Sequence, residues 1–150
     1  MVVNLDKSEA LDRLRSARVA RLATANASGQ PHIVPVTFAL RGRIVVTAVD
    51  HKPKTTGNLR RLRNIYENNQ VSLLADEYDD RDWSRLWWVR ADGAARIVED
   101  AHERAEPLSW LLGKYEQYRD NPPVGPVIWI DIEVLRGWSY MGSIKPRADG

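Results

Sequence analysis

The chain has 150 residues, enough for one domain with its own core, and its composition, 43% hydrophobic and 28% charged, is that of an ordinary globular protein. No apolar run reaches the ~20 residues that cross a bilayer, and the lack of cysteine excludes disulfides, thiol catalysis and Cys-ligated zinc. The formal net charge is only +2, and no apolar leader opens the chain. We therefore predict a single cytoplasmic domain over residues 1–150, with a flexible tail over 143–150 and no membrane span.

The first third of the chain predicts one helix followed by strands. Asp6 and Glu9 form a capping-box pattern, which starts a helix that ends near Arg18. Pro35 cannot donate a backbone hydrogen bond to a sheet ladder, so its strand is predicted at a sheet edge or at a bulge. The predicted strands cover 19–25, 31–40 and 43–49.

The rest of the chain continues with closely spaced strands and few helices. The pattern predicts a helix over 55–67, a strand over 70–76, a long strand or bulged hairpin over 86–98, a helical region over 100–118 interrupted near Pro107, and two strands over 126–134 and 137–142. Regular strand–helix alternation, the signature of a parallel sheet, is missing. The fold class is therefore predicted as mainly β (α+β), an antiparallel barrel with a few short helices.

Positive charge is concentrated between Arg41 and Arg63, where seven Lys/Arg accompany a single acid, Asp50. The remaining chain carries 15 basic and 19 acidic residues, so the broad basic surface of a nucleic-acid binder is not predicted. Lys52 and Lys54 precede a predicted helix, whose N-terminal amides favour phosphate. The segment therefore predicts a site for a local anionic ligand, and the alternative is a solvated basic helix.

Other sites of known chemistry are not indicated. The three histidines, His32, His51 and His102, lack the spacing of metal ligands, so no metal site is predicted. Trp87 and Trp88 are adjacent within a predicted strand and must point to opposite faces. One of them can fill the barrel while the other faces a ligand or a second subunit.

Four stretches of the chain resemble, in order and spacing, the split β-barrel flavin/deazaflavin oxidoreductases related to pyridoxamine-5′-phosphate oxidase. They are ARLATANASGQPHIVPVTFAL, RIVVTAVDHKPK, LRRLRNIYENNQVSLLAD and WVRADGAARIV, and the likeness runs from residue 17 to residue 142. Within that superfamily the chain is most similar to the coenzyme F420-dependent branch. The resemblance implies a split antiparallel β-barrel, FMN-binding-protein-like, that forms a homodimer with two cofactor sites at the subunit interface.

The resemblance also implies where the cofactor binds. The strand around Pro35 is expected to lay its backbone along the flavin-like ring, and Thr47 and Lys54 are expected to contact the phosphate. Trp88 stands where the oxidases have glutamine and is expected to meet the ring from the partner subunit, which argues against oxidase activity. Taken with the charge pattern, the expected cofactor-binding residues are Val34, Pro35, Val36, Thr37, Thr47, Ala48, Lys52, Lys54, Arg60 and Trp88.

The expected cofactor is coenzyme F420, because its phospholactate and glutamate tail need a longer basic track than the single phosphate of FMN. Lys52 and Lys54, followed by Arg60, Arg61 and Arg63, can supply that track. The expected reaction is hydride transfer between F420 and a flat, conjugated small-molecule acceptor, without an identifiable catalytic side chain. Three alternatives stay open: an FMN-dependent oxidase or reductase of the same fold, a non-catalytic F420 carrier, and a basic barrel that binds nucleic acid.

Overall fold

A computed structural model describes residues 2–49 and 59–140. The predicted tail over 143–150 lies outside the described residues, as do Lys52 and Lys54. The elements in chain order are β1 (Val2–Asn4), α1 (Lys7–Ser16), β2 (Ala20–Ala25), β3 (Pro31–Val36), β4 (Ala39–Arg41), β5 (Ile44–Ala48), α2 (Arg60–Glu67), β6 (Gln70–Glu77), the 3-10 turn η2 (Trp83–Arg85), β7 (Trp87–Val98), α3 (Ala101–Lys114), α4 (Glu116–Asp120) and β8 (Val127–Tyr140).

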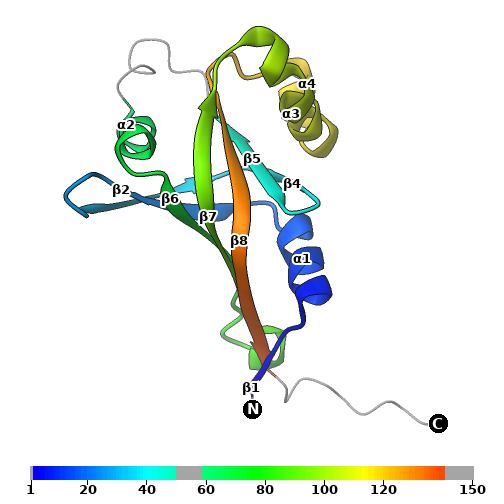
Figure 1. The fold of residues 1–150 in the computed structure, drawn as a ribbon. Coiled ribbons are helices and arrows are strands. Elements are labelled where there is room, and N and C mark those ends of the chain that lie inside the picture. The colour runs from blue at the N-terminus through cyan, green and yellow to red at the C-terminus, as the bar shows by residue number, and fades with distance from the viewer. Residues whose placement is uncertain (1, 50–58, 141–150) are drawn as a thin grey trace.

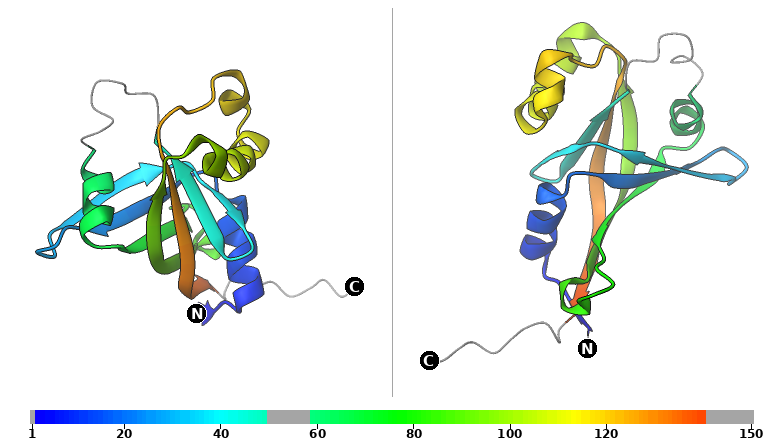
Figure 2. Two further views of the ribbon diagram at one scale, coloured as in Figure 1. Left: turned by 45° about the horizontal axis from the view of Figure 1, so that its top comes forward. Right: turned by 180° about the vertical axis from the view of Figure 1, so that it is seen from behind.

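The strands form one eight-stranded antiparallel sheet in the order β3-β2-β6-β7-β8-β5-β4, with β1 added on β8. The sheet curls, so that β2 and β3 cross behind β7 and β8, while α2 and the α3–α4 pair lie on opposite sides of the upper end of β7 and β8 (Figures 1 and 2). The prediction of a mainly β, split-barrel fold is confirmed.

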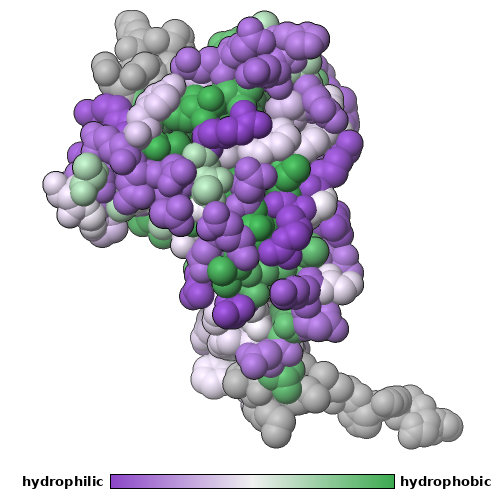
Figure 3. Space-filling view, viewed as in Figure 1, coloured by the Kyte–Doolittle hydropathy of each residue, from purple (hydrophilic) through white to green (hydrophobic). Residues whose placement is uncertain are grey.

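The two longest strands, β7 and β8, form the spine of the barrel. They pair from Trp87–Ser139 to Val98–Val127, with one register shift between Asp92 and Gly93. The prediction of two separate C-terminal strands is wrong, because the ladder with β7 carries β8 without a break through residues 135–137. The face of the molecule seen in Figure 3 mixes hydrophilic and hydrophobic residues.

The main core lies inside the barrel and is built from alternate residues of the strands, with α1 packed against it. Phe38, which connects β3 to β4, is fully buried, as is Leu14 of α1. Asp6 caps α1 by accepting a hydrogen bond from the Glu9 amide at 2.8 Å. The Glu9 carboxylate turns instead to Arg13, 3.0 Å away, so only half of the predicted capping box forms.

Two predicted helix boundaries are wrong. Leu59 has an extended backbone (φ −62°, ψ 133°), so α2 begins at Arg60 rather than near residue 55. The helical region after residue 100 does not break at Pro107, which is buried within α3; the chain leaves helical geometry at Tyr115 (φ −116°, ψ 116°). Among the described residues no helix is long and apolar enough to cross a membrane.

Candidate cofactor site

The strand expected to face the ring lies at one edge of the sheet. Among the described strands β3 pairs only with β2, so its other edge is open within this part of the chain, and the prediction that Pro35 occupies an edge strand is confirmed. Along β3 the side chains alternate: Pro35 is exposed, whereas Val36 is buried and Val34 packs against the barrel core. Unpaired backbone groups along this edge are therefore available to a ligand that lies beside the strand.

Thr37 and Thr47, which the resemblance places at the cofactor, meet where the barrel closes. The Thr47 hydroxyl, in β5, donates to the Thr37 carbonyl at 2.6 Å and is almost fully buried. The Thr37 hydroxyl lies 2.7 Å from the hydroxyl of Tyr118, in α4. Ala48, next along β5, is buried in the smaller core cluster beneath α3. The end of β3 is thus tied to both β5 and α4.

Sequence reasoning missed two tyrosines that hold this junction. The Tyr115 hydroxyl lies 2.9 Å from the Arg18 carbonyl and 3.0 Å from the Phe38 carbonyl, and it accepts from the Phe38 amide at 3.2 Å. Burial raises the pKa of Tyr115, which keeps the hydroxyl protonated. An open cavity of about 720 Å³ beside the strand connection is bordered by Arg18, Thr37, Tyr115 and Tyr118. The sequence signal was the repeated tyrosine in "KYEQY", which extends past the end of α3.

Lys114 adds a titratable group to the same junction. Its ammonium donates to the Ala17 carbonyl at 2.7 Å and lies 4.1 Å from the centre of the Phe38 ring. Burial, and to a lesser degree the neighbouring Arg18 guanidinium, lowers the pKa of Lys114 from its ordinary 10.5 to about 8.

The lowered pKa of Lys114 predicts a pH-dependent stability. Between pH 8 and 10.5 the unfolded chain binds more protons at this residue than the folded chain, so the free energy of unfolding should rise with pH in that window. Lys114→Met removes the titration, and its urea-unfolding midpoint should rise less than that of the wild type across the same window. Parallel curves for the two proteins would contradict the lowered pKa. The effect is reduced by solvent, because Lys114 is only half buried.

The cations of α2 gather at the opposite end of β3. Arg60 and Arg63 share one helix face and, with Asn26 and Gln30 of the β2–β3 turn, border a small cavity of about 190 Å³. Burial and the positive charges of Arg60 and Arg61 lower the pKa of His32, in β3. The buried Nδ1 atom of His32 has no hydrogen-bond partner among the described residues.

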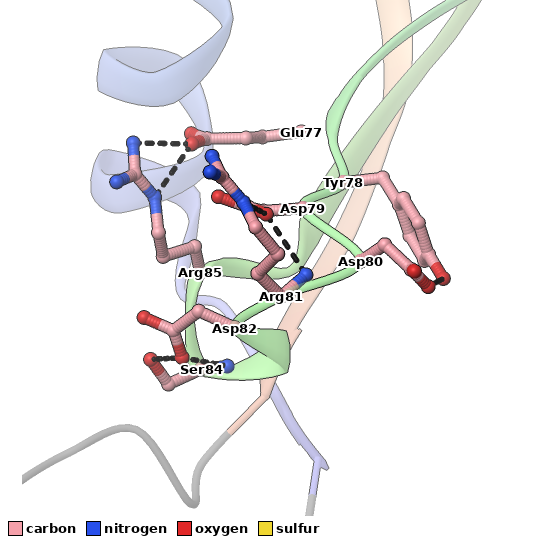
Figure 4. Close-up of polar contacts among 8 residues, drawn as sticks. All are labelled: Glu77, Tyr78, Asp79, Asp80, Arg81, Asp82, Ser84 and Arg85. Carbon is pink, nitrogen blue, oxygen red and sulfur yellow. Dashed lines mark hydrogen bonds and ion pairs between the residues drawn. The ribbon is translucent and has the colours of Figure 1, made fainter.

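The carboxylates at the end of β6 and in the loop after it bind partners that are close by in the chain. Figure 4 shows Glu77 joined to Arg85, with the closest contact at 3.0 Å, and Asp82 accepting from Ser84. Asp79 likewise pairs with Arg81, and Asp80 accepts from Tyr78 at 3.0 Å. These carboxylates are thus engaged by neighbours within residues 77–85, whereas Glu67 of α2 borders the same small cavity as Arg60 and Arg63.

The two adjacent tryptophans of β7 face opposite sides, as predicted. Trp87 packs against the barrel core and donates its Nε1 hydrogen to Glu77 at 3.1 Å. Trp88 lies on the outer face, where it borders a cavity of about 460 Å³ with Ile33 and Leu74. Within one chain, Trp88 is thus on the outside of the sheet, whereas Thr47 is buried at the closure of the barrel. One chain does not bring these two residues together.

Lys52 and Lys54 lie outside the described residues, so the phosphate end of the expected site has no structural description. Among residues 2–49 and 59–140, no cluster of three His, Asp or Glu side chains is arranged to hold a metal ion. Of the other expected residues, Val34 to Thr37, Thr47 and Ala48 lie around one junction, Arg60 lies near the start of β3, and Trp88 lies on the outer face.

The sequence over residues 7–139 matches the pyridoxamine 5′-phosphate oxidase family. The chain belongs to this family. A curated relative, a 5a,11a-dehydrotetracycline/5a,11a-dehydrooxytetracycline reductase from Streptomyces rimosus subsp. rimosus, is 39% identical over 97 residues. The aligned part covers 63% of this chain and 65% of the relative, which is slightly less than two thirds of its length.

Solved structures of low sequence identity share the fold of this family member. A conserved hypothetical protein from Mycobacterium tuberculosis superimposes with a TM-score of 0.74 at 19% identity, and the match covers 97% of this chain and 92% of the other. A FAD-binding protein from Mesorhizobium loti gives a TM-score of 0.69 at 24% identity, with 93% of this chain and 99% of the other covered. At these identities the likeness shows the fold alone.

Proposed function

We propose that this family member is an F420-dependent oxidoreductase that reduces a flat, conjugated small molecule. When bound, the deazaflavin would supply the hydride, and the residues of the chain would bind and orient the reacting rings. Membership of the pyridoxamine 5′-phosphate oxidase family and the similarity to a named reductase support a redox reaction in the reductive direction.

The main support for the proposal is the position of β3 between the cations of α2 and the junction at Thr37. This strand has an open edge and begins beside the cations of α2, where His32 lies near Arg60. It leads into Thr37, whose carbonyl oxygen accepts a hydrogen bond from the Thr47 hydroxyl at 2.6 Å. One element therefore offers positive charge at one end and unpaired backbone at the other. A ligand with a polyanionic tail and a planar ring fits this arrangement. The buried Nδ1 atom of His32, which has no hydrogen-bond partner among the described residues, lies at the cationic end.

The cations of α2 favour F420 over FMN. The single phosphate of FMN needs no more than the expected lysines, Lys52 and Lys54, whereas Arg60 and Arg63 extend the positive charge along α2. The glutamate tail of F420 would use that extension. A flavin-dependent reaction is the alternative, and the protein of the same fold from Mesorhizobium loti is described as FAD-binding.

A site that uses both Trp88 and Thr47 requires two subunits, and we propose a homodimer. The outer face that carries Trp88 also exposes Ile33, whose side chain is 62% accessible, and Val134, which is 37% accessible. Aliphatic and aromatic side chains exposed together on a sheet face favour burial by a partner. With a second copy on this face, the partner's Trp88 would approach the open edge of β3.

A non-catalytic carrier is the second candidate, because no side chain of the described residues is identified as the catalytic acid or base of a reaction. The two candidates differ in turnover. A carrier binds reduced F420 without oxidising it when quinones such as menadione are added, whereas a reductase oxidises many equivalents with at least one such acceptor.

Complementation between subunits tests the proposed site. Lys54→Ala and Trp88→Ala homodimers should each bind F420 at least about tenfold more weakly than the wild type, because each lacks one half of both sites. A heterodimer of the two variants contains one site with Lys54 and Trp88 both intact, so it should bind one F420 per dimer with wild-type affinity. If the heterodimer binds F420 as weakly as the two variant homodimers, then each site takes Lys54 and Trp88 from the same subunit. That result would contradict the arrangement.

A further inference from the structure

The outer face of the β7–β8 ladder carries a square array of two tryptophans and two arginines. Trp88 lies opposite Trp138, and two residues along, Arg90 lies opposite Arg136. Directly opposed residues in an antiparallel pair project from the same face and are near neighbours. The two indoles meet edge to face, with their ring centres 5.9 Å apart and an angle of 74° between the planes.

One of the two arginines of the array is paired with an acid, and the other is not. Arg90 is held by Asp92, whose carboxylate lies 3.2 Å from its Nε atom and also accepts from Ser72 at 2.7 Å. Arg136 is exposed, and its guanidinium has no hydrogen bond or ion pair with the residues that the structure describes. Like charges directly opposite one another destabilise a sheet. An anion that both guanidiniums share would remove that cost.

A depression of about 720 Å³ gives such an anion room. It lies between β1, β7 and β8, and both tryptophans and both arginines border it. Lys7 adds a third cation, whereas the one carboxylate on the border, Asp6, is already engaged in capping α1. Gly137 lets β7 and β8 approach closely between these pairs, because a β-carbon there would lie 2.8 Å from the Trp88 carbonyl oxygen and 3.0 Å from the buried Val89 side chain.

We propose that this depression binds the anionic end of a planar aromatic ligand, one that carries a carboxylate or an ionised enol. The indoles supply flat contact area, and the planar guanidinium forks of Arg90 and Arg136 match the two oxygens of the anion. The assignment of this ligand as the hydride acceptor rests on the proposed function. Trp88 borders both this depression and the cavity with Ile33, so an acceptor anchored here lies against the indole expected to face the cofactor.

The site can be tested without cofactor by titrating tryptophan fluorescence with two matched probes. Anthraquinone-2-carboxylate carries the anion, and 2-(hydroxymethyl)anthraquinone has the same rings without it. The carboxylate should bind about tenfold more tightly, and Arg136→Gln should abolish that preference. Arg136→Lys keeps the positive charge but lacks the planar guanidinium, so it should keep part of the preference for the carboxylate probe. Arg96→Gln is the control, because Arg96 lies 4.9 Å from the Trp129 ring on the same two strands, away from the depression.

Equal affinities for the two probes in the wild type, or a preference that survives Arg136→Gln, would overturn the proposal. F420 binding, which tests the proposed function, is measured separately. Binding of F420 should be unchanged in Arg136→Gln, so loss of the carboxylate preference alone identifies the anion site. If the wild type prefers the carboxylate probe but does not bind F420, the anion site is supported and only the proposal of F420 as cofactor is rejected.

Discussion

Replacing Gly93 with alanine is expected to lower the free energy of unfolding by about 3 kcal/mol or more, a large part of the ~5–15 kcal/mol that stabilises a typical domain. Gly93 lies at the register shift of the β7–β8 ladder. A β-carbon at this position would lie only 2.1 Å from the Asp131 carbonyl oxygen and 2.9 Å from the Asp131 carbonyl carbon. Both are backbone atoms of β8 and cannot rotate away, so the two central strands must separate locally.

The matched control is Gly113→Ala, since a β-carbon at Gly113 meets no atom within 4 Å. Gly113 lies in α3, where alanine is favoured over glycine by ~0.5–1 kcal/mol, so this variant should be as stable as the wild type or more so. Urea-unfolding midpoints of the three proteins measure the effect. A Gly93→Ala midpoint equal to that of the wild type would mean that the strands do not approach as closely as described.

The consequence of Gly93→Ala extends to function, because β7 contributes Trp88 and Arg90 to both outer cavities and β8 contributes Arg136 and Trp138 to one of them. Trp88 and Arg90 precede the register shift, and Arg136 and Trp138 are their partners on β8. A change in pairing at Gly93 would displace the ladder that sets these four side chains opposite one another. Loss of stability in this variant should therefore be accompanied by loss of F420 binding.

The features that local chemistry decides were predictable from the sequence. Pro35 lacks an amide hydrogen, which restricts it to an edge strand, and the structure places it in one. The period of a strand forces Trp87 and Trp88 to opposite faces, and the resemblance supplied the barrel as a whole. Asp6 caps α1 as its pattern predicts.

The features that depend on tertiary contacts were not predictable. The segment around Arg136 and Gly137 resembles a turn in isolation, but pairing with β7 holds it in one continuous strand. Tyr115 and Tyr118 are ordinary helix-end residues in the sequence, and only the packing of α3 and α4 brings their hydroxyls to Phe38 and Thr37. Long-range contacts of this kind leave no local periodic signal.

The second large effect concerns the choice of cofactor. Lys54→Ala should weaken F420 binding by at least about tenfold, because a charge-assisted contact to the phosphate is lost. Arg60→Ala should weaken F420 binding more than FMN binding, since only F420 carries a glutamate tail that could reach α2. The Arg60 guanidinium lies on the helix face that borders the small cavity, so the substitution leaves the core intact. Arg96→Gln is again the control, with no expected effect on either ligand.

The most direct measurement is the equilibrium binding of F420 and of FMN to the purified protein, side by side, followed by quenching of tryptophan fluorescence. We expect tight binding of F420, weaker binding of FMN, and loss of F420 binding in Lys54→Ala but not in Arg96→Gln. Tighter binding of FMN would assign the protein to the flavin-dependent members of its family. Binding of neither ligand would contradict a cofactor site along β3 and leave the cations of α2 to a different anion.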